Sequence, residues 1–98
     1  MLNASFSQDI SEAVKEKAEN LTLLQPKTYE NLDEQLEEEK RDTTFLRYFA
    51  NISRQNNYPE GEAYALNQLG MRYRNYSQYE KSVQLHEQAL ELSEKANN

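Results

Sequence analysis

Hydrophobic residues recur at intervals of three and four positions along this chain, which is the period of an amphipathic α-helix. The first such stretch predicts a helix over residues 7–24, with Ser5 or Ser7 capping its free N–H groups. Gln25-Pro26 ends this helix, because the residue before a proline is pushed out of helical geometry. Its apolar stripe consists of Phe6, Ile10, Val14, Leu21, Leu24 and the stem of Lys17.

The middle of the chain predicts two shorter helices. One begins near Thr28, with Tyr29, Leu32 and Leu36 on a single face. Residues 37–44 then pass without an apolar side chain, so the helix either continues fully solvated or breaks. We favour a break near Asp42, whose carboxylate can cap a third helix. The apolar residues of that third helix are Phe45, Leu46, Phe49 and Ile52.

The clearest boundary is Asn56-Asn57-Tyr58-Pro59, because asparagine tolerates left-handed geometry and proline suits the first turn of a helix. It separates a helical region at 1–58, expected to hold a degenerate or capping repeat, from a helix–turn–helix unit at 59–98. We predict a fourth helix over 59–74, a turn at 75–77 with a Ser77–Glu80 capping box, and a fifth helix over 78–95. The residues of the fifth helix expected to face inward are Tyr79, Ser82, Val83, His86, Ala89, Leu90 and Ala96.

The last two helices read Leu69-Gly70-x-x-Tyr73, then Tyr79-Glu80-Lys81-Ser82, then Ala89-Leu90. Over residues 63–96 this spacing resembles the tetratricopeptide repeat, a helix–turn–helix unit of about 34 residues. Small side chains at Gly70, Ser82 and Ala89 suit close helix crossings, and Tyr73 and His86 suit the spaces between them. The proline common near the end of the motif is missing, and Leu66 stands where tryptophan is usual. The resemblance implies an all-α fold, a fragment of a right-handed α-solenoid with about five helices packed as antiparallel hairpins.

A second observation extends the resemblance. With a shift of 40 residues, Phe45 aligns with Leu85, Phe49 with Ala89, and Ser53 with Ser93. The third helix therefore resembles the second helix of an earlier, degenerate repeat. Repeats of about forty residues that start with Gly-Glu-Ala, here residues 61–63, resemble those of spindle-orientation adaptors and bacterial response-regulator-binding proteins. Because one repeat cannot bury its faces alone, we expect this chain to be the beginning of a longer array.

Composition excludes several classes of partner. The formal net charge is −6 and no basic cluster is present, which argues against nucleic acid and against an anionic membrane surface. The chain has no cysteine, and it shows neither a signal peptide nor a stretch long enough to span a bilayer. We therefore expect an intracellular, cytoplasmic protein.

No arrangement of residues predicts catalysis or a cofactor. His86 is the only histidine, and a lone histidine on an apolar helical face is a packing residue far more often than a general base. The run Glu37-Glu38-Glu39 lacks the alternating ligands of a calcium loop, so we interpret it as a solvated charged face. No glycine-rich loop is present to hold a phosphate. The prediction is a non-enzymatic protein without cofactor or metal.

The resemblance implies a groove on the exposed face of the fourth helix. By position in the repeat, the residues that contact a peptide or helix of a partner protein would be Tyr64, Asn67, Met71 and Arg74. The alternative is that these side chains pack against a missing neighbour or face water. We predict a protein–protein interaction module, an adaptor or scaffold. The alternative is a structural unit that self-associates through its first helix or through the surface near Leu90, Leu92 and Ala96.

Overall fold

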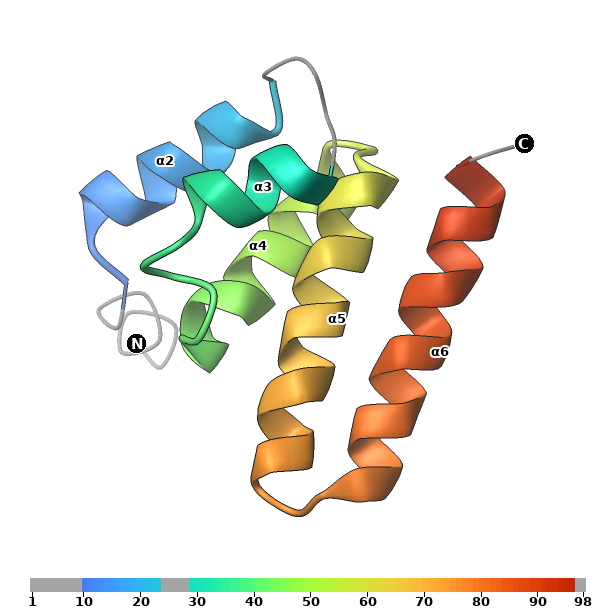
Figure 1. The fold of residues 1–98 in the computed structure, drawn as a ribbon. Coiled ribbons are helices and arrows are strands. Elements are labelled where there is room, and N and C mark those ends of the chain that lie inside the picture. The colour runs from blue at the N-terminus through green and yellow to red at the C-terminus, as the bar shows by residue number, and fades with distance from the viewer. Residues whose placement is uncertain (1–9, 24–28, 97–98) are drawn as a thin grey trace, which may run out of the picture.

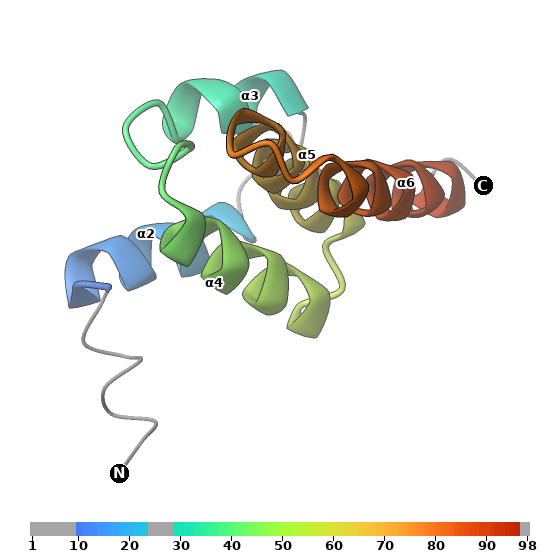
Figure 2. The ribbon, with the colours of Figure 1, turned by 90° about the horizontal axis from the view of Figure 1, so that it is seen from below.

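The described part of the computed structural model, residues 10–23 and 29–96, contains five helices and no strand. They are α2 (Glu12–Leu21), α3 (Tyr29–Gln35), α4 (Thr43–Gln55), α5 (Pro59–Asn75) and α6 (Tyr79–Ala96). Helices α4, α5 and α6 pack antiparallel in chain order, and α5 is central (Figure 1). In the view along the bundle, α3 and α4 lie on opposite sides of α5 (Figure 2). The expected all-α class and the antiparallel packing are confirmed.

Helix α2 is shorter than the predicted 7–24 helix. It is capped by Ser11, whose Oγ accepts a hydrogen bond from the Val14 N–H at 3.2 Å. The predicted caps Ser5 and Ser7 and the predicted terminator Gln25-Pro26 lie outside the described residues. Ala18 and Leu21 carry the buried face, so the predicted stripe is confirmed at Leu21.

The predicted break before the third helix is confirmed. Residues 36–41 form turns, and Asp42 caps α4 by accepting hydrogen bonds at Oδ1 from the Thr44 and Phe45 N–H groups, at 3.0 and 3.3 Å. The turns also correct one expectation. Glu39 is not a freely solvated carboxylate, because Lys17 Nζ of α2 lies 3.1 Å from its Oε1. This ion pair joins the α3–α4 connection to α2.

The two turns that flank α5 have the same backbone design. Asn57 and Ser77 adopt left-handed conformations, with φ of 56° and 65°. After each of them, the next N–H reaches back to the preceding helix: Tyr58 to the Ser53 carbonyl and Gln78 to the Tyr73 carbonyl, both at 2.8 Å. This is the Schellman arrangement. The predicted Ser77–Glu80 capping box is therefore wrong, because Ser77 closes α5 and lacks the extended geometry of an N-cap.

Two glycines allow the central helices to approach closely. A Cβ at Gly61 would lie 2.6 Å from Ser53 Oγ of α4, and one at Gly70 would lie 2.7 Å from His86 Nε2 of α6. Ala89 is also buried at the α5–α6 crossing. The predicted role of Gly70 and Ala89 is confirmed, and Gly61 plays the same role between α4 and α5. The large side chains that fill the core are Phe45, Leu46, Phe49, Tyr58, Tyr64, Leu32 and Leu36.

The predicted inward face of α6 is only partly correct. Ser82 and Ala89 are buried, whereas Tyr79, Val83, Leu90 and Ala96 are exposed. Helix α6 packs mainly on α5, which covers one side of it. The residues that complete this covered side are Leu85 and Leu92, both partly buried against the core. No helix in the described ranges has the length and apolar character to cross a membrane.

Candidate functional site

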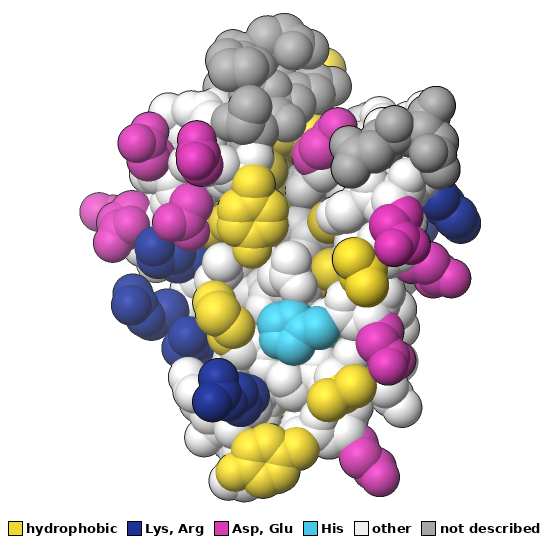
Figure 3. All heavy atoms as spheres, turned by 45° about the vertical axis from the view of Figure 1, so that its right-hand side comes forward, with side chains coloured by type: hydrophobic (Ala, Val, Ile, Leu, Met, Phe, Trp, Pro, Cys, Tyr) yellow, Lys and Arg dark blue, Asp and Glu magenta, His cyan; other side chains and the backbone are white. Residues whose placement is uncertain are grey.

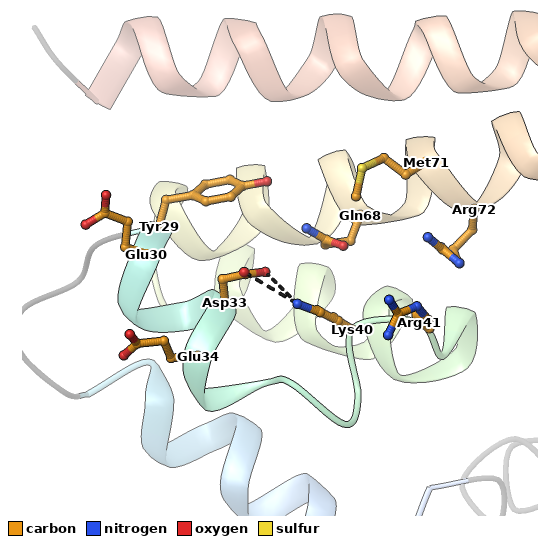
Figure 4. Close-up of a pocket in the computed structure, with 9 residues that line it drawn as sticks. All are labelled: Tyr29, Glu30, Asp33, Glu34, Lys40, Arg41, Gln68, Met71 and Arg72. Atoms are coloured by element: carbon orange, nitrogen blue, oxygen red, sulfur yellow. Dashed lines mark hydrogen bonds and ion pairs between the residues drawn. The ribbon is translucent and has the colours of Figure 1, made fainter.

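A cleft of about 590 Å³ lies between α3, the turns that follow it, and α5. Figure 4 shows its walls, with α3 on one side and α5 on the other. Its position follows from the fold, because α3 covers the first half of α5 and leaves the second half open toward the α3–α4 connection. The lining residues are Tyr29, Glu30, Asp33, Glu34, Lys40, Arg41, Gln68, Met71 and Arg72.

Helix α3 is held on α5 by Tyr64. The Tyr64 ring packs edge-on against Tyr29, with centroids 4.8 Å apart, and its hydroxyl donates to Asp33 Oδ1 at 3.0 Å. Tyr64 is 0% exposed, and this burial, followed by the hydrogen bond to Asp33, raises the pKa of its hydroxyl well above the ordinary value. The predicted exposure of Tyr64 in a groove is therefore wrong. Its side chain holds α3 against α5, and this packing fixes the position of one wall of the cleft.

One end of the cleft is acidic. Glu30, Asp33 and Glu34 all come from α3. Asp33 is engaged, because Lys40 Nζ lies 3.4 Å from its Oδ1, and the same ammonium lies 3.1 Å from Glu37 Oε1. The hydrogen bond to Glu37 is the main cause that raises the pKa of Lys40, so this lysine stays charged. Neither Glu30 nor Glu34 forms an ion pair with any other described residue.

The other end of the cleft holds two guanidinium groups without partners. Arg41, in the turn before α4, and Arg72, on α5, form no ion pair within residues 10–23 and 29–96. Figure 4 shows both at the Lys40 end of the cleft. The Nε atom of Arg72 is buried and lacks a hydrogen-bond partner. Because Arg41 and Arg72 have no carboxylate partner among the described residues, their terminal N–H groups can pair with an anion that enters the cleft.

The structure separates the four residues that the sequence assigns to a groove. Only Met71, 39% exposed, lines the cleft. Asn67 faces α6, where its Oδ1 pairs with His86 Nδ1 at 2.8 Å. Arg74 is exposed and lies outside the lining.

Of the α5 residues that line the cleft, Gln68 and Arg72 were not assigned to a site from the sequence. With Tyr64 they occupy positions i, i+4 and i+8 of α5, which lie on one side of a helix. That spacing was visible in the sequence. The sequence did not show that these residues line a cleft, because only the fold places α3 beside this side of α5. Helix α6 packs against the side of α5 that carries Asn67.

We compared the chain with protein-family models, curated proteins and solved structures, and no family model, curated protein or solved structure matched it. The chemistry of the cleft therefore rests on its geometry. No group of three or more histidine, cysteine, aspartate or glutamate side chains within the described ranges is arranged to hold a metal ion. The cleft presents acidic side chains at one end, guanidinium groups at the other, and the Tyr29 ring and the Met71 thioether among the polar side chains between them.

Proposed function

We propose that this chain is a non-enzymatic interaction module that holds a peptide segment of a partner protein in the cleft between α3 and α5. The observation that carries the proposal is a pair of guanidiniums, Arg41 and Arg72, that form no ion pair with any other described residue and lie at one end of a cleft that is also lined by Met71 and Tyr29. The resemblance of residues 63–96 to the tetratricopeptide repeat supports the class of function, though not this cleft in particular, because stacked repeats of that kind form protein-binding surfaces.

The charges that line the cleft indicate which charged residues a bound peptide should carry. A planar guanidinium pairs with a carboxylate through two parallel hydrogen bonds, and such charge-assisted bonds are worth about 1.5–3 kcal/mol each. An aspartate or glutamate of the peptide therefore lies at the Arg72 end. Glu30 and Glu34 attract a lysine or arginine at the opposite end. An apolar side chain between these two charges covers Met71 and Tyr29.

The test is a selection of random peptides displayed on phage against the whole chain, followed by affinity measurements on the selected peptides. Replacement of Arg72 by glutamine removes the charge and keeps most of the stem. Arg74→Gln is the matched control, because it removes the same charge from the same helix at a position outside the cleft. Circular dichroism checks that both variants retain their helices.

We expect selected peptides to share an acidic residue at a fixed position. Their affinity should fall at least about tenfold in Arg72→Gln and stay within about twofold of wild type in Arg74→Gln, since one lost charge-assisted bond is worth more than 1.4 kcal/mol. Equal losses in the two variants would show that only net charge matters. Peptides that bind Arg72→Gln as tightly as wild type would show that the cleft is not the binding site.

A further inference from the structure

Helix α6 carries an apolar strip that no described helix covers. Tyr79, Val83 and Leu90 are 62%, 53% and 59% exposed. With the partly buried His86 they stand at intervals of four, three and four residues, which places them on one side of the helix. Figure 3 shows this face of the molecule, with hydrophobic side chains around the histidine. We call Tyr79, Val83, His86 and Leu90 the α6 strip.

The α6 strip is bordered by a column of glutamates. Glu80, Glu87, Glu91 and Glu94 follow the same helical spacing and lie next to the strip on the side away from α5. None of them forms an ion pair with another described residue. In Figure 3 acidic side chains run down the right of the hydrophobic ones, and on the left basic side chains lie below a second acidic group. An occupant of this face must therefore bring positive charge to the α6 edge.

Helix α4 shows what kind of occupant the α6 strip fits. With the shift of 40 residues, Leu46, Ala50 and Ser53 correspond to His86, Leu90 and Ser93. The three α4 residues are buried on the side of the helix that faces α5, whereas Leu90 and Ser93 are exposed. On α4 the covering partner is a helix, α5, which brings Gly61 against Ser53. Positions that α5 covers on α4 are therefore not covered by a described helix at the equivalent places on α6.

The same alignment gives the charge of the occupant. Arg54 Nε on α4 lies 3.0 Å from Glu62 Oε2 on α5, and this pair borders the α4–α5 contact. The α6 residue that corresponds to Arg54 is Glu94. The sign is reversed, so the helix that covers α6 should carry lysine or arginine where α5 carries Glu62. A second copy of this chain with its α6 antiparallel to the first fits poorly, because the glutamate columns of the two strips would then face each other.

We propose that the α6 strip docks an amphipathic helix of a partner protein in the orientation in which α5 lies on α4. The docked helix presents glycine or alanine to Ser93, apolar side chains to His86 and Leu90, and a basic edge to Glu94 and the neighbouring glutamates. This surface does not involve Arg41 or Arg72, so the inference stands whether or not the cleft binds a peptide.

The test uses two synthetic peptides derived from α5. The basic probe has the sequence of residues 59–75 with Glu60→Lys and Glu62→Lys. The other probe keeps the natural sequence and is called the acidic probe after its first turn, which carries Glu60 and Glu62. A lactam bridge on the solvent side holds each probe helical. Binding to the whole chain is measured by isothermal titration calorimetry. The protein variants are Leu90→Lys in the strip, Glu94→Lys at its edge and, as the matched control, Glu38→Lys at an exposed position in the α3–α4 turns.

The basic probe should bind wild type and Glu38→Lys with similar affinity, bind Glu94→Lys roughly tenfold more weakly, and lose binding to Leu90→Lys. The acidic probe should show the reverse preference, with Glu94→Lys bound more tightly than wild type. Equal weakening by Glu38→Lys and Glu94→Lys would mean attraction by net charge alone and would overturn the proposal. It would also be overturned by absence of binding, or by light scattering that shows a dimer of the chain which Leu90→Lys dissociates.

Discussion

Helices α4 and α6 carry related patterns of side chains 40 residues apart, and they meet different surroundings. Helix α4 has α5 on one side and α2 on the other, where the Tyr48 hydroxyl donates to Glu19 Oε2. Helix α6 packs mainly on α5, and its apolar strip is open. The spacing of apolar side chains therefore indicates which face of a helix can be buried. The neighbouring helices determine how much of that face is buried in the fold. The predictions below test how far this difference in surroundings changes the consequence of the same substitution.

The largest contrast should come from Leu46→Ala and Leu90→Ala. Leu46 is fully buried on α4, so its truncation leaves a cavity and should lower the free energy of unfolding by about 2–5 kcal/mol. Leu90 is exposed on α6, and its truncation should change stability by less than about 0.5 kcal/mol. Urea denaturation followed by circular dichroism measures both values. A large cost at Leu90 would mean that a second copy of the chain covers it in solution.

The second contrast is between the two crossing glycines. An alanine at Gly61 would meet Ser53 and the Tyr58 ring, both of which are buried and fixed, so Gly61→Ala should destabilise by about 1–3 kcal/mol. An alanine at Gly70 would meet the His86 ring, which is partly exposed and can swing outward. The gain in helix propensity, about 1 kcal/mol, should offset the loss of the hydrogen bond between His86 Nδ1 and Asn67 Oδ1, about 0.5–1.5 kcal/mol, and leave Gly70→Ala close to wild type. Urea denaturation measures the change in the free energy of unfolding for both variants. Equal losses of stability would contradict the idea that the surroundings of Gly61 are more rigid than those of Gly70.

Alkaline pH should lower the free energy of unfolding, in part through the buried hydroxyl of Tyr58. Burial, followed by the charge of Glu60, raises the pKa of Tyr58 to about 12 from the ordinary value of 10. A raised folded-state pKa favours the protonated hydroxyl, so this contribution is complete below pH 10 and is lost as the pH rises to about 12. The loss at pH 11 should be about 1 kcal/mol. Stability measured at pH 9 and pH 11 should therefore fall less in Tyr58→Phe than in wild type, whereas Tyr76→Phe, at an exposed position, should behave as wild type.

The smallest effect should appear at the two left-handed turn residues. Glycine adopts this conformation without steric cost, so Ser77→Gly should stabilise the chain by about 0.5–1 kcal/mol. Asn57→Gly should gain less, because asparagine tolerates the left-handed region better than serine does. Thermal unfolding of the two single variants gives the comparison. If Ser77→Gly destabilised the chain, the serine side chain would have a role in the α5–α6 turn that the backbone geometry does not show.

The elements that the sequence predicted correctly depend on local chemistry. The Asp42 cap, the first-turn position of Pro59 and the close approach at Gly70 each follow from one residue type and its immediate neighbours. The Ser77–Glu80 capping box failed for a local reason too. The same serine can cap the helix that follows or close the helix that precedes, and the choice depends on the length of the connection between two packed helices.

The candidate site was predicted much less completely. Of the four residues assigned by position in a repeat, only Met71 lines the cleft, because Tyr64 is buried under α3 and Asn67 faces α6. The cleft itself depends on α3, a short helix whose place beside α5 is not visible in a periodic pattern. The unpaired arginines could not be recognised from the sequence either, because the absence of an ion pair is a property of long-range geometry.

The sequence by itself determined that this chain is helical, where most of its helices begin and end, and which small residues permit close crossings. Those features arise from backbone preferences and from the spacing of apolar side chains along a few turns. The tertiary structure alone decided that Tyr64 is covered, that Arg41 and Arg72 share a cleft, and that the α6 strip has no covering helix within the described residues. The physical reason is that burial and charge pairing depend on distances between segments far apart in the chain, which no local pattern specifies.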